Sequence, residues 1–483
     1  MADPDVIIAG GGPTGLMLGV ELRLAGAGVL VVERRAERER VQPGALGLHA
    51  RILEIFDQRG IAERFLAEGS PAQVAGFAGV KLDISDFPTR HPYGLSLIQK
   101  HSERILADWA EEIGVPIRRG AEIVDFDQDE TGVTIRLADG RRLRTLYLVG
   151  CDGGRSFVRK QAGIAFPGSD PTISHLLAEA ELAGEPPLGL HSDAIGTHAL
   201  SRTGTGRFGI MVTESRIGSG PATLDDLRAA MIAHYGTDFG VSDPSYVTRF
   251  TDMTRQAETY RQGRVLLAGD AAHIHYPAGG FGMGIGIQDA VNLGWKLALV
   301  AKGIAPESLL DTYHAERHPA AALLLRYTMA SVALARRDER SQALATIAGN
   351  LARMEEPRRV LGGDMSGLGL HYDLGGGHPL VGRRMPDLDL ETDAGPMRVY
   401  ELLRDARPLL LVFRPEAGMD VGLWSTRVRI IHARYTGDWD LPVIGRVEAP
   451  RAVQVRPDGH VAWVGAETDA SLITALSRWY GPA

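Results

Sequence analysis

Cysteine is nearly absent from this sequence, because Cys151 is the one cysteine in 483 residues. A single thiol can form neither an intramolecular disulfide bond nor a cysteine-rich metal site. Such scarcity is typical of a reducing compartment, and we expect a cytoplasmic protein. No stretch approaches the ~18 consecutive apolar residues of a membrane span, and the acidic first residues do not form the basic region of a secretory signal. We therefore expect no membrane association.

An excess of positive charge is also absent. The chain has 52 lysine and arginine residues against 60 aspartate and glutamate residues, a formal net charge of −8. Nucleic-acid-binding proteins normally carry a basic face or stripe, so we expect no nucleic-acid partner. Hydrophobic residues make up 44% and charged residues 23% of the chain, which is typical of a folded protein. The length allows about two or three domains.

The first thirty residues have the pattern of a βαβ unit. Residues 5–9 and 29–32 are short apolar runs, as strands buried on both faces require. Between them, residues 16–25 have helical periodicity and residues 10–15 form a turn. This turn matches the pattern G-x-G-x-x-G, which is typical of dinucleotide-binding folds.

Each glycine of the turn has its own role in that pattern. Gly10 makes the tight turn, Gly12 lets the backbone approach a pyrophosphate, and Gly15 lets the helix pack closely on the strand. Glu33 follows 23 residues after Gly10, at the end of the second strand. A carboxylate there accepts hydrogen bonds from a ribose 2′-hydroxyl and repels a 2′-phosphate, which predicts FAD or NAD rather than NADP in this site. The alternative is a purely structural turn beside a solvated Glu33.

A second segment follows the apolar run at residues 147–150. Asp152 and Gly153 form a turn, and Arg155 and Arg159 are expected four residues apart on one helical face, where they would meet phosphates. A plain strand-turn-helix with exposed arginines explains the same residues.

A third segment follows the apolar run at residues 265–268. Asp270, at the end of that strand, is well placed to accept a ligand hydroxyl. Residues 277–286 then contain five glycines, and a helix is expected from about Gly286 to Lys302. Because so many glycines are costly in chain entropy, we interpret them as backbone that lies against a flat ring, with the helix N-terminus directed at that ring. The alternative is a glycine-rich surface loop.

The order of these segments predicts an α/β fold in which a sheet-rich insertion interrupts a parallel layer. Within the insertion, strands are expected at 174–182, 197–203 and 207–213, and a helix at 223–235. The expected boundaries are 1–69, 99–165 and 263–345 for the dinucleotide-binding domain, 70–98 and 166–262 for a substrate-binding domain, 346–385 for a helical linker, and 386–483 for a separate C-terminal domain.

Taken together, the motifs resemble a known family: GGGPTG with Glu33, CDGGRSFVR, and GDAAH followed by PAGGFGMGIGIQDAVNLGWKLA. The chain resembles the FAD-dependent aromatic hydroxylases, which are single-component class A flavoprotein monooxygenases. Within them it looks like the actinobacterial branch that acts on aromatic polyketides and rifamycin-type antibiotics. The resemblance covers nearly the whole chain. It implies a Rossmann-like FAD-binding domain of the GR2 type, an inserted sheet-rich substrate domain, and a thioredoxin-like C-terminal domain without cysteine.

The resemblance also implies a reaction. NADPH (or NADH) visits as a transient co-substrate and reduces FAD, and O2 then gives a flavin C4a-hydroperoxide that hydroxylates a bulky phenolic or polyketide-type substrate. The setting would be antibiotic biosynthesis or antibiotic resistance. Water must be kept from the peroxide, which requires a dry pocket. Two alternatives remain: Baeyer–Villiger-type oxygenation, or a flavin-binding relative that has lost turnover. The oligomeric state is not indicated.

The site residues follow from the resemblance and from the expected insertion. No catalytic base is identified, because His198, His234, His273 and His275 all remain candidates, and no metal site is expected. The residues expected to bind FAD are Gly10, Gly12, Pro13, Thr14, Gly15, Glu33, Arg34, Gln99, Arg104, Asp152, Arg155, Asp270, Pro277, Gly282, Met283 and Gly284. The substrate pocket is expected to include Phe77, Phe87, Tyr93, Phe208 and Met211, for which ordinary core packing is the alternative.

Three features depart from the family pattern. Residues 42–47 contain no arginine, where relatives commonly have one. Phe281 stands where many relatives have glutamine, and Gly284 where asparagine is usual. These changes remove polar contacts around the flavin, so they affect how tightly FAD binds and how its ring is positioned.

Overall fold

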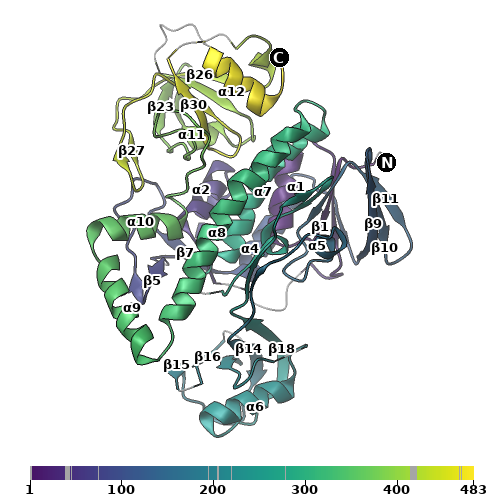
Figure 1. The fold of residues 1–483 in the computed structure, drawn as a ribbon, viewed down its shortest axis with the longest axis vertical. Helices are drawn as coiled ribbons and strands as arrows, with labels where there is room; N and C mark the ends of the chain where they lie inside the picture. The colour runs from purple at the N-terminus through teal and green to yellow at the C-terminus, as the bar shows by residue number, and fades with distance from the viewer. Residues whose placement is uncertain are drawn as a thin grey trace.

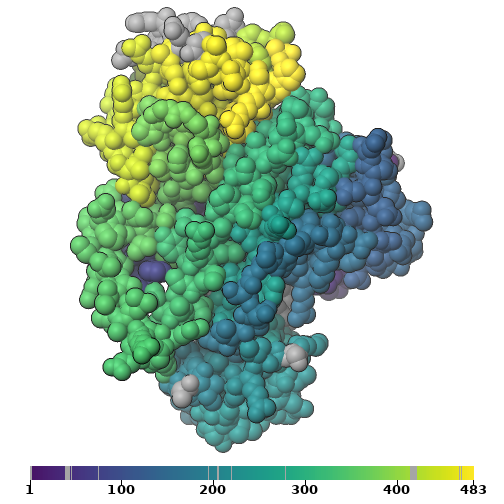
Figure 2. Space-filling model, viewed as in Figure 1, coloured from purple at the N-terminus to yellow at the C-terminus, as the bar shows by residue number. Residues whose placement is uncertain are grey.

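The computed structural model describes residues 3–38, 44, 46–73, 75–193, 195–203, 206–218, 220–277, 279–413, 421–466, 468 and 470–483. Gln42, Pro43 and Ala45 of the arginine-free stretch, and Ala278 of the glycine-rich segment, lie outside the described residues. Within the described part, no helix combines the length and the apolar character that crossing a membrane requires. The insertion and the C-terminal domain lie at opposite ends of the molecule (Figures 1 and 2).

A six-stranded sheet carries the βαβ unit, with the order β20-β21-β12-β1-β2-β8. It contains the four strands predicted from apolar runs, which are parallel neighbours: β1 Val6–Ala9, β2 Val29–Glu33, β12 Tyr147–Gly150 and β21 Val265–Leu267. Their side chains are buried almost throughout, which explains the uninterrupted apolar runs. The edge strands β8 Ile117–Arg119 and β20 Arg261–Gln262 are short and polar, so the sequence carries no such signal for them.

Two helices begin earlier than their sequence patterns predict: α1 at Pro13–Leu24 and α7 at Gly282–Ala301. Three glycines of the glycine-rich segment therefore lie inside α7. A Cβ added at Gly286 would overlap with Thr14, and one added at Gly294 would overlap with Glu21. Gly286 is thus explained by close packing of α7 on α1, and our interpretation that it faces a flat ring is wrong.

Further elements surround this sheet. Residues 46–48 form strand β3, and helix α2 begins at Ala50. The elements are β3 Leu46–Leu48, α2 Ala50–Gln58, α3 Ala62–Leu66, α4 Gln99–Glu112, β9 Ile123–Asp129, β10 Gly132–Leu137, β11 Arg142–Thr145, α5 Phe157–Gln161, η1 Gly269–Ala271 and η2 Glu307–Leu310. Strands β13 Gly168–Ser169, β19 Thr254–Gln256 and β22 His273–Ile274 join the insertion to this layer.

The insertion is a five-stranded antiparallel sheet covered on one face by α6 Leu224–Tyr235 (Figure 1). The three strands and the helix predicted here are all present. Because strand residues alternate between faces, the core face packs on α6 and the other face is open. The strands, in the order β15-β16-β17-β14-β18, are β15 Gly189–Ser192, β16 Thr197–Arg202, β17 Phe208–Thr213, β14 Ser174–Glu181 and β18 Ser242–Thr251.

Residues 70–98 pack on helices and not on the α6 side of that sheet. Ala75 and Leu82 belong to a hydrophobic cluster with Phe281, Ala321 and Ala352. This segment contains β4 Ser70–Ala72, β5 Gly76–Phe77, β6 Val80–Lys81 and β7 Gly94–Ile98, and β7 pairs with β3 and β4. The helices are α8 Asp311–Leu334, α9 Glu339–Ala352 and α10 Glu355–Ser366.

The C-terminal domain has its own six-stranded sheet and core. Its order is β24-β23-β26-β25-β29-β30, and β25 is parallel to β26 but antiparallel to β29. The elements are β23 Asp389–Thr392, β24 Gly395–Arg398, α11 Val399–Leu402, β25 Leu409–Val412, η3 Gly422–Thr426, β26 Arg429–Arg434, β27 Asp440–Leu441, β28 Gly445–Arg446, β29 Ala452–Val455, β30 Val461–Gly465 and α12 Ala470–Tyr480.

Candidate functional site

The three glycine-bearing segments converge on one cavity of about 910 Å³. The cavity lies at the carboxyl ends of the parallel strands β1, β2, β12 and β21, where ligands bind in open α/β sheets. Its lining includes the expected residues Gly10, Gly12, Pro13, Glu33, Arg34, Asp152, Arg155 and Asp270. Segments that are more than a hundred residues apart in the sequence therefore share one site.

The glycine turn is shaped as its pattern predicts. Gly10 has φ +108°, and a Cβ there would overlap with the carbonyl oxygen of Cys151. A Cβ at Gly15 would overlap with the carbonyl oxygen of Gly10, so both positions require glycine for packing. A Cβ at Gly12 would have no neighbour within 4 Å, although Gly12 lines the cavity. Packing within the chain therefore does not require glycine at position 12, and the backbone of Gly12 is open to the cavity.

Glu33 lies at the end of β2 and is only 5% exposed. Its carboxylate accepts hydrogen bonds from the backbone N–H groups of Gly11 at 2.6 Å and Arg35 at 2.8 Å. These bonds hold the carboxylate against the glycine turn. Because a carboxylate offers about four acceptor positions, Glu33 retains capacity for a ribose hydroxyl.

The second segment is organised by Asp152. Its carboxylate accepts hydrogen bonds from the hydroxyl of Ser156 at 2.5 Å and from the backbone of Phe157 at 2.7 Å, and it thereby caps α5. Arg155 precedes α5, is exposed and lines the cavity. Asp152 therefore positions the turn that presents Arg155.

The prediction that Arg159 meets phosphates is wrong. Arg159 is 4% exposed and donates hydrogen bonds to the carbonyl oxygens of Ala271 at 2.9 Å and Gly154 at 3.1 Å. Its guanidinium also lies 3.7 Å from the centre of the Phe166 ring. Since Arg155 stands before the helix, the two arginines do not share a helical face; Arg159 instead joins the second segment to the Asp270 turn.

A buried network that the sequence did not indicate supports the Asp270 turn. Asp289 accepts hydrogen bonds from the backbone of Gly269 at 3.1 Å, from His273 at 2.7 Å and from Arg317 at 2.8 Å. Burial alone would raise the pKa of Asp289, but the charges of His273 and Arg317 lower it below its ordinary value. His273 is thus occupied structurally, while the Asp270 carboxylate is exposed to the cavity.

Only some of the residues expected around the flavin ring lie beside the ligand cavity. A Cβ on Gly282 would lie 4.0 Å from Asp270 and 3.6 Å from His275 Nε2, so Gly282 is beside the ligand cavity. Met283 is buried in the main core, and Gly284 faces Ile52. Of the other expected FAD contacts, Pro277 is exposed and Thr14 packs against Gly269 and Gly286. Phe281, which departs from the family pattern, stacks on His49 with ring centres 4.7 Å apart.

Two smaller cavities lie beside the large one and share lining residues in sequence. A cavity of about 340 Å³ shares Glu103 with it and is also lined by Gly11, Lys100, His101 and Arg104. Arg104 is exposed there and forms ion pairs with Glu68 and Asp108. Gln99, at the start of α4, lies beside Gly44. A third cavity, of about 440 Å³, shares Lys100 and His101 with the second.

The third cavity lies on the open face of the insertion sheet. Its lining includes Leu177, Ala199, Ser201, Met211 and Tyr246. Met211 is the one residue of the expected substrate pocket among them. Phe208 is three positions away on the same strand, so its side chain points to the α6 core, and its assignment to the pocket is wrong.

The other expected pocket residues lie elsewhere. Phe77 packs edge-on against Tyr327, Phe87 belongs to a cluster with Ile84, and Tyr93 is beside His91. The five aromatic and methionine side chains therefore do not converge on one pocket.

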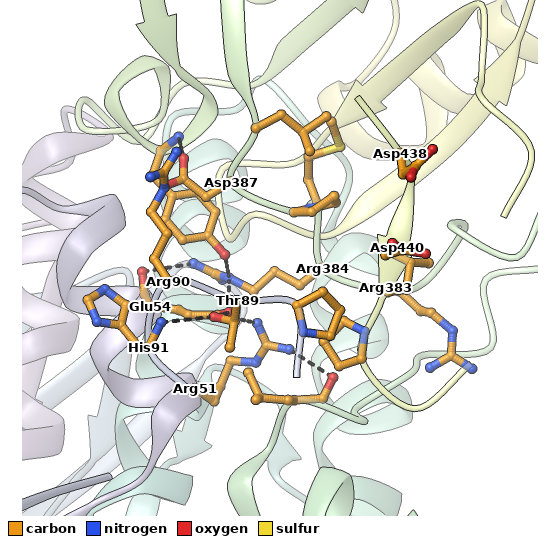
Figure 3. A pocket seen from close by; sticks show the side chains of 18 of the residues that line it. Arg51, Glu54, Thr89, Arg90, His91, Arg383, Arg384, Asp387, Asp438 and Asp440 are labelled. Carbon is orange, nitrogen blue, oxygen red and sulfur yellow. Dashed lines mark hydrogen bonds and ion pairs between the residues drawn. The ribbon is translucent and has the colours of Figure 1, made fainter. Parts of the chain in front are cut away.

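A separate cavity of about 340 Å³ lies between α2, residues 88–91 and the C-terminal domain (Figure 3). It is strongly charged, but its buried charges are paired: Arg51 bonds to Glu54, and Arg384 lies 3.6 Å from Glu54 and bonds to Gln58. None of the expected cofactor residues lines it. We interpret this cavity as part of the domain interface.

Two family models match this chain. The model described as FAD binding domain matches residues 3–328, and the model described as aromatic-ring hydroxylase, C-terminal, matches residues 378–483. The rifampicin monooxygenase of Streptomyces venezuelae is 44% identical, with 99% of each chain covered.

Solved structures also match along the whole chain. The OxyS anhydrotetracycline hydroxylase from Streptomyces rimosus has 42% identity and a TM-score of 0.89, with 99% of each chain covered. CabE, an aromatic hydroxylase from angucycline biosynthesis, has 40% identity and a TM-score of 0.89, with 100% of each chain covered.

Proposed function

Because this chain belongs to the family of FAD-dependent aromatic-ring hydroxylases and is an FAD-dependent monooxygenase, we propose that it hydroxylates a bulky phenolic or polyketide-type aromatic compound. The observation that carries the proposal is the row of three cavities, each sharing lining residues with the next. The row leads from the glycine turn to the open face of the insertion sheet.

The residues of the large cavity fit the ADP half of FAD. Gly12 leaves its backbone open to a pyrophosphate, the N-terminus of α1 points at the same place, and Glu33 is held where a ribose would lie. Asp270 accepts hydroxyl groups of the ribityl chain, and Arg155 contributes positive charge beside the phosphates. When bound, FAD supplies hydride transfer from NADPH or NADH and oxygen transfer from O2 to the substrate.

The chain's own residues prepare the substrate site. A cavity of about 440 Å³ is within the range of about 300–1,000 Å³ typical of pockets for drug-sized ligands. Leu177, Ala199 and Met211 provide an apolar wall for an aromatic ring. Tyr246 lines the same cavity, and burial raises its pKa, so its hydroxyl stays protonated and could donate a hydrogen bond to a substrate oxygen.

Among the four candidate bases, His275 is the one beside Gly282 and Asp270. Burial lowers its pKa, so the imidazole is neutral near pH 7. Its Nδ1 donates a hydrogen bond to the carbonyl oxygen of Tyr276 at 2.7 Å, which leaves the lone pair on Nε2, the nitrogen beside Gly282. His198 lies on the core face of β16 and His273 is bonded to Asp289. We therefore assign the role of proton acceptor to His275.

We also propose a thioredoxin-like fold for the C-terminal domain and a GR2-type fold for the FAD-binding domain. The order β26-β25-β29-β30, with one parallel pair and two antiparallel pairs, followed by α12, supports the first assignment. The parallel order β12-β1-β2 around the glycine turn supports the second.

The experiment uses the purified FAD-loaded protein with NADPH or NADH, O2 and two probe substrates, rifampicin and anhydrotetracycline. These probes are taken from the names of the relatives. We expect substrate-dependent NAD(P)H oxidation and a product heavier by one oxygen atom that carries label from ¹⁸O2. Product NMR separates a new hydroxyl group from ring insertion. Oxidation that yields only H2O2 with every polycyclic phenol tested would contradict the proposal.

A further inference from the structure

Three side chains with metal-binding groups meet between the insertion sheet and its helix. Asp193 precedes β16, His198 lies on β16 and His234 lies on α6. One ligand atom of each residue lies within 4.8 Å of the others. Asp193 Oδ2 is 2.7 Å from His234 Nδ1 and 3.4 Å from His198 Nε2. Among the described residues, this is the one group of histidine, cysteine or acidic residues with such geometry.

The partners of His234 require a cation at this place. Its Nε2 lies 2.5 Å from the carbonyl oxygen of Thr213, so this nitrogen carries a hydrogen and donates it. Its Nδ1 faces the carboxylate of Asp193, which is also an acceptor. A neutral imidazole donates through one nitrogen and presents a lone pair on the other. Either a second proton or a metal ion must therefore stand between Nδ1 and the carboxylate.

The carboxylate is held in position for such an ion. Asp193 Oδ1 accepts hydrogen bonds from the backbone N–H groups of Ile195 at 2.7 Å and Gly196 at 3.0 Å, which directs Oδ2 toward both imidazoles. The bond from His234 to a backbone carbonyl is the outer contact that metal-bound histidines usually make. These contacts fix the ligand atoms before any ion binds.

The two imidazoles are buried and lie against each other. The side chains of His198 and His234 are 3% and 0% exposed, and their rings are stacked 3.7 Å apart. A divalent ion would use one lone pair of each imidazole, including the Nε2 lone pair of His198, which faces the carboxylate of Asp193.

We propose that Asp193, His198 and His234 bind one divalent transition-metal ion, with Zn²⁺ as the expected ion. Two imidazoles and a carboxylate suit Zn²⁺, which binds them at about 2.0–2.2 Å and leaves a fourth position for water. Two ligands of one tetrahedral ion are then about 3.4 Å apart, as Asp193 and His198 already are. Asp193 and His234 would move apart by a few tenths of an ångström. Mg²⁺ and Ca²⁺, which prefer oxygen ligands, would bind poorly.

The position of the ion indicates what it does. His198 is on the core face of β16, whereas Ala199 and Ser201 on the same strand line the 440 Å³ cavity. Arg337, at the α8–α9 corner, donates a hydrogen bond to the backbone oxygen of Asp193 at 3.0 Å. The ion would therefore join α6 and this corner to the strand that shapes the proposed substrate wall. It would be structural, because it lies on the opposite face of the sheet from that wall.

The first test uses the full-length FAD-loaded protein after chelator treatment and dialysis. We expect calorimetric titration with Zn²⁺ to give one site per chain, Co²⁺ to produce d–d absorption that Zn²⁺ abolishes, and Zn²⁺ to raise the melting temperature. Mg²⁺ should do none of these. Absence of the Co²⁺ bands together with a melting temperature unaffected by Zn²⁺ would overturn the proposal and assign a doubly protonated His234 instead.

The second test uses the variants Asp193→Asn, His198→Gln and His234→Gln. Loss of only the hydrogen bond that orients a metal-bound histidine weakens metal binding by about 10–100-fold. Loss of a direct ligand should therefore weaken Zn²⁺ binding by roughly 100-fold or more. His314→Gln is the matched control, because His314 and His318 also lie close together, at 4.7 Å, and should retain full Zn²⁺ affinity. Equal Zn²⁺ binding by all four variants would show that other histidines hold the metal. If the ligand variants fail to fold, the Co²⁺ spectrum of the unsubstituted protein decides.

Discussion

At the scale of single residues, Gly12 is where a side chain and a ligand would compete for the same space. We expect Gly12→Val to place two methyl groups in the 910 Å³ cavity and to weaken FAD binding by at least about tenfold, or 1.4 kcal/mol. FAD occupancy of the purified protein, read from its absorption, measures this. Gly377→Val is the control, because a Cβ at Gly377 also has no neighbour within 4 Å but lies outside this cavity. Normal FAD occupancy in the Gly12 variant would contradict the ADP-site assignment.

Met211 and Phe208 test which face of the insertion sheet binds substrate. Met211→Ala should raise the KM for an aromatic substrate with little change in stability, because Met211 lines the open-face cavity. Phe208→Ala should instead destabilise the insertion by about 3–5 kcal/mol, since it leaves a void in the α6 core. Steady-state kinetics and urea unfolding of both variants separate the two effects. A raised KM in a stable Phe208 variant would place the substrate on the other face.

The residues whose places in the fold the sequence predicts correctly lie within one local unit. Gly10, Gly15 and Glu33 act within one βαβ unit, so their spacing alone predicts their places. Arg159 bonds to Ala271, 112 residues away, and Asp289 bonds to Arg317, 28 residues away. No local pattern indicates these contacts. The wrong assignment of Phe208 to the substrate pocket was avoidable, because the alternation of side chains along a strand places Phe208 and Met211 on opposite faces of the sheet.

At the scale of elements, long apolar segments were predictable and short polar ones were not. The buried strands β1, β2, β12 and β21 carry continuous apolar runs, whereas β8 is a three-residue edge strand with two arginines. Helix α7 begins at Gly282, four residues before its predicted start. Its first turns contain Gly282 and Gly284, and glycine is a poor helix former in isolation, so the sequence pattern misses them. Packing on α1 and α2 stabilises these turns, and packing is not visible in a local pattern.

The contact between α1 and α7 can be tested with two glycines of α7. A Cβ at Gly294 would overlap with the Cβ of Glu21, so Gly294→Ala should separate the helices and lower the free energy of unfolding by about 1–3 kcal/mol. Gly284→Ala is the matched control, since its Cβ would meet the flexible side chain of Ile52 at 3.2 Å, and alanine is favoured over glycine in a helix by about 0.5–1 kcal/mol. We expect this control to be neutral or slightly stabilising in urea unfolding. Equal effects of the two substitutions would mean that helix propensity, and not the close approach of α1 and α7, determines the change in stability.

At the scale of the whole molecule, a buried charge network joins the C-terminal domain to the FAD-binding domain. Arg456, in the turn before β30, bonds to Glu316 of α8 at 2.8 Å and to Asp458 at 2.5 Å. Lys296 of α7 lies 3.0 Å from Glu316, and Arg456 also lies 4.6 Å from the ring centre of Trp479. The separate core of the C-terminal domain was predictable from its own strands, but this connection was not, because its charged residues look like ordinary surface residues in the sequence.

Removing one partner of this network should cost more than removing a surface ion pair. Glu316→Gln leaves Arg456 and Lys296 buried with less compensation, and we expect it to lower the free energy of unfolding by about 3–5 kcal/mol at pH 7. Glu112→Gln is the control, because the Arg64–Glu112 pair is largely exposed and its loss should change the free energy of unfolding far less. Urea unfolding followed by tryptophan fluorescence measures both, since Trp295 and Trp479 lie at this interface.

The same network makes a prediction about pH. Burial alone would raise the pKa of Glu316, but Arg456 and Lys296 lower it from 4.5 to about 2. The folded form therefore binds the Glu316 proton less readily than the unfolded chain does, so its contribution to stability is complete above about pH 4.5 and is lost as the pH falls toward 2. The difference in unfolding free energy between the unsubstituted protein and Glu316→Gln should accordingly shrink over this range, whereas the difference for Glu112→Gln stays small throughout. A difference for Glu316→Gln that is unchanged between pH 5 and pH 3 would show that the ionised carboxylate does not hold the two domains together.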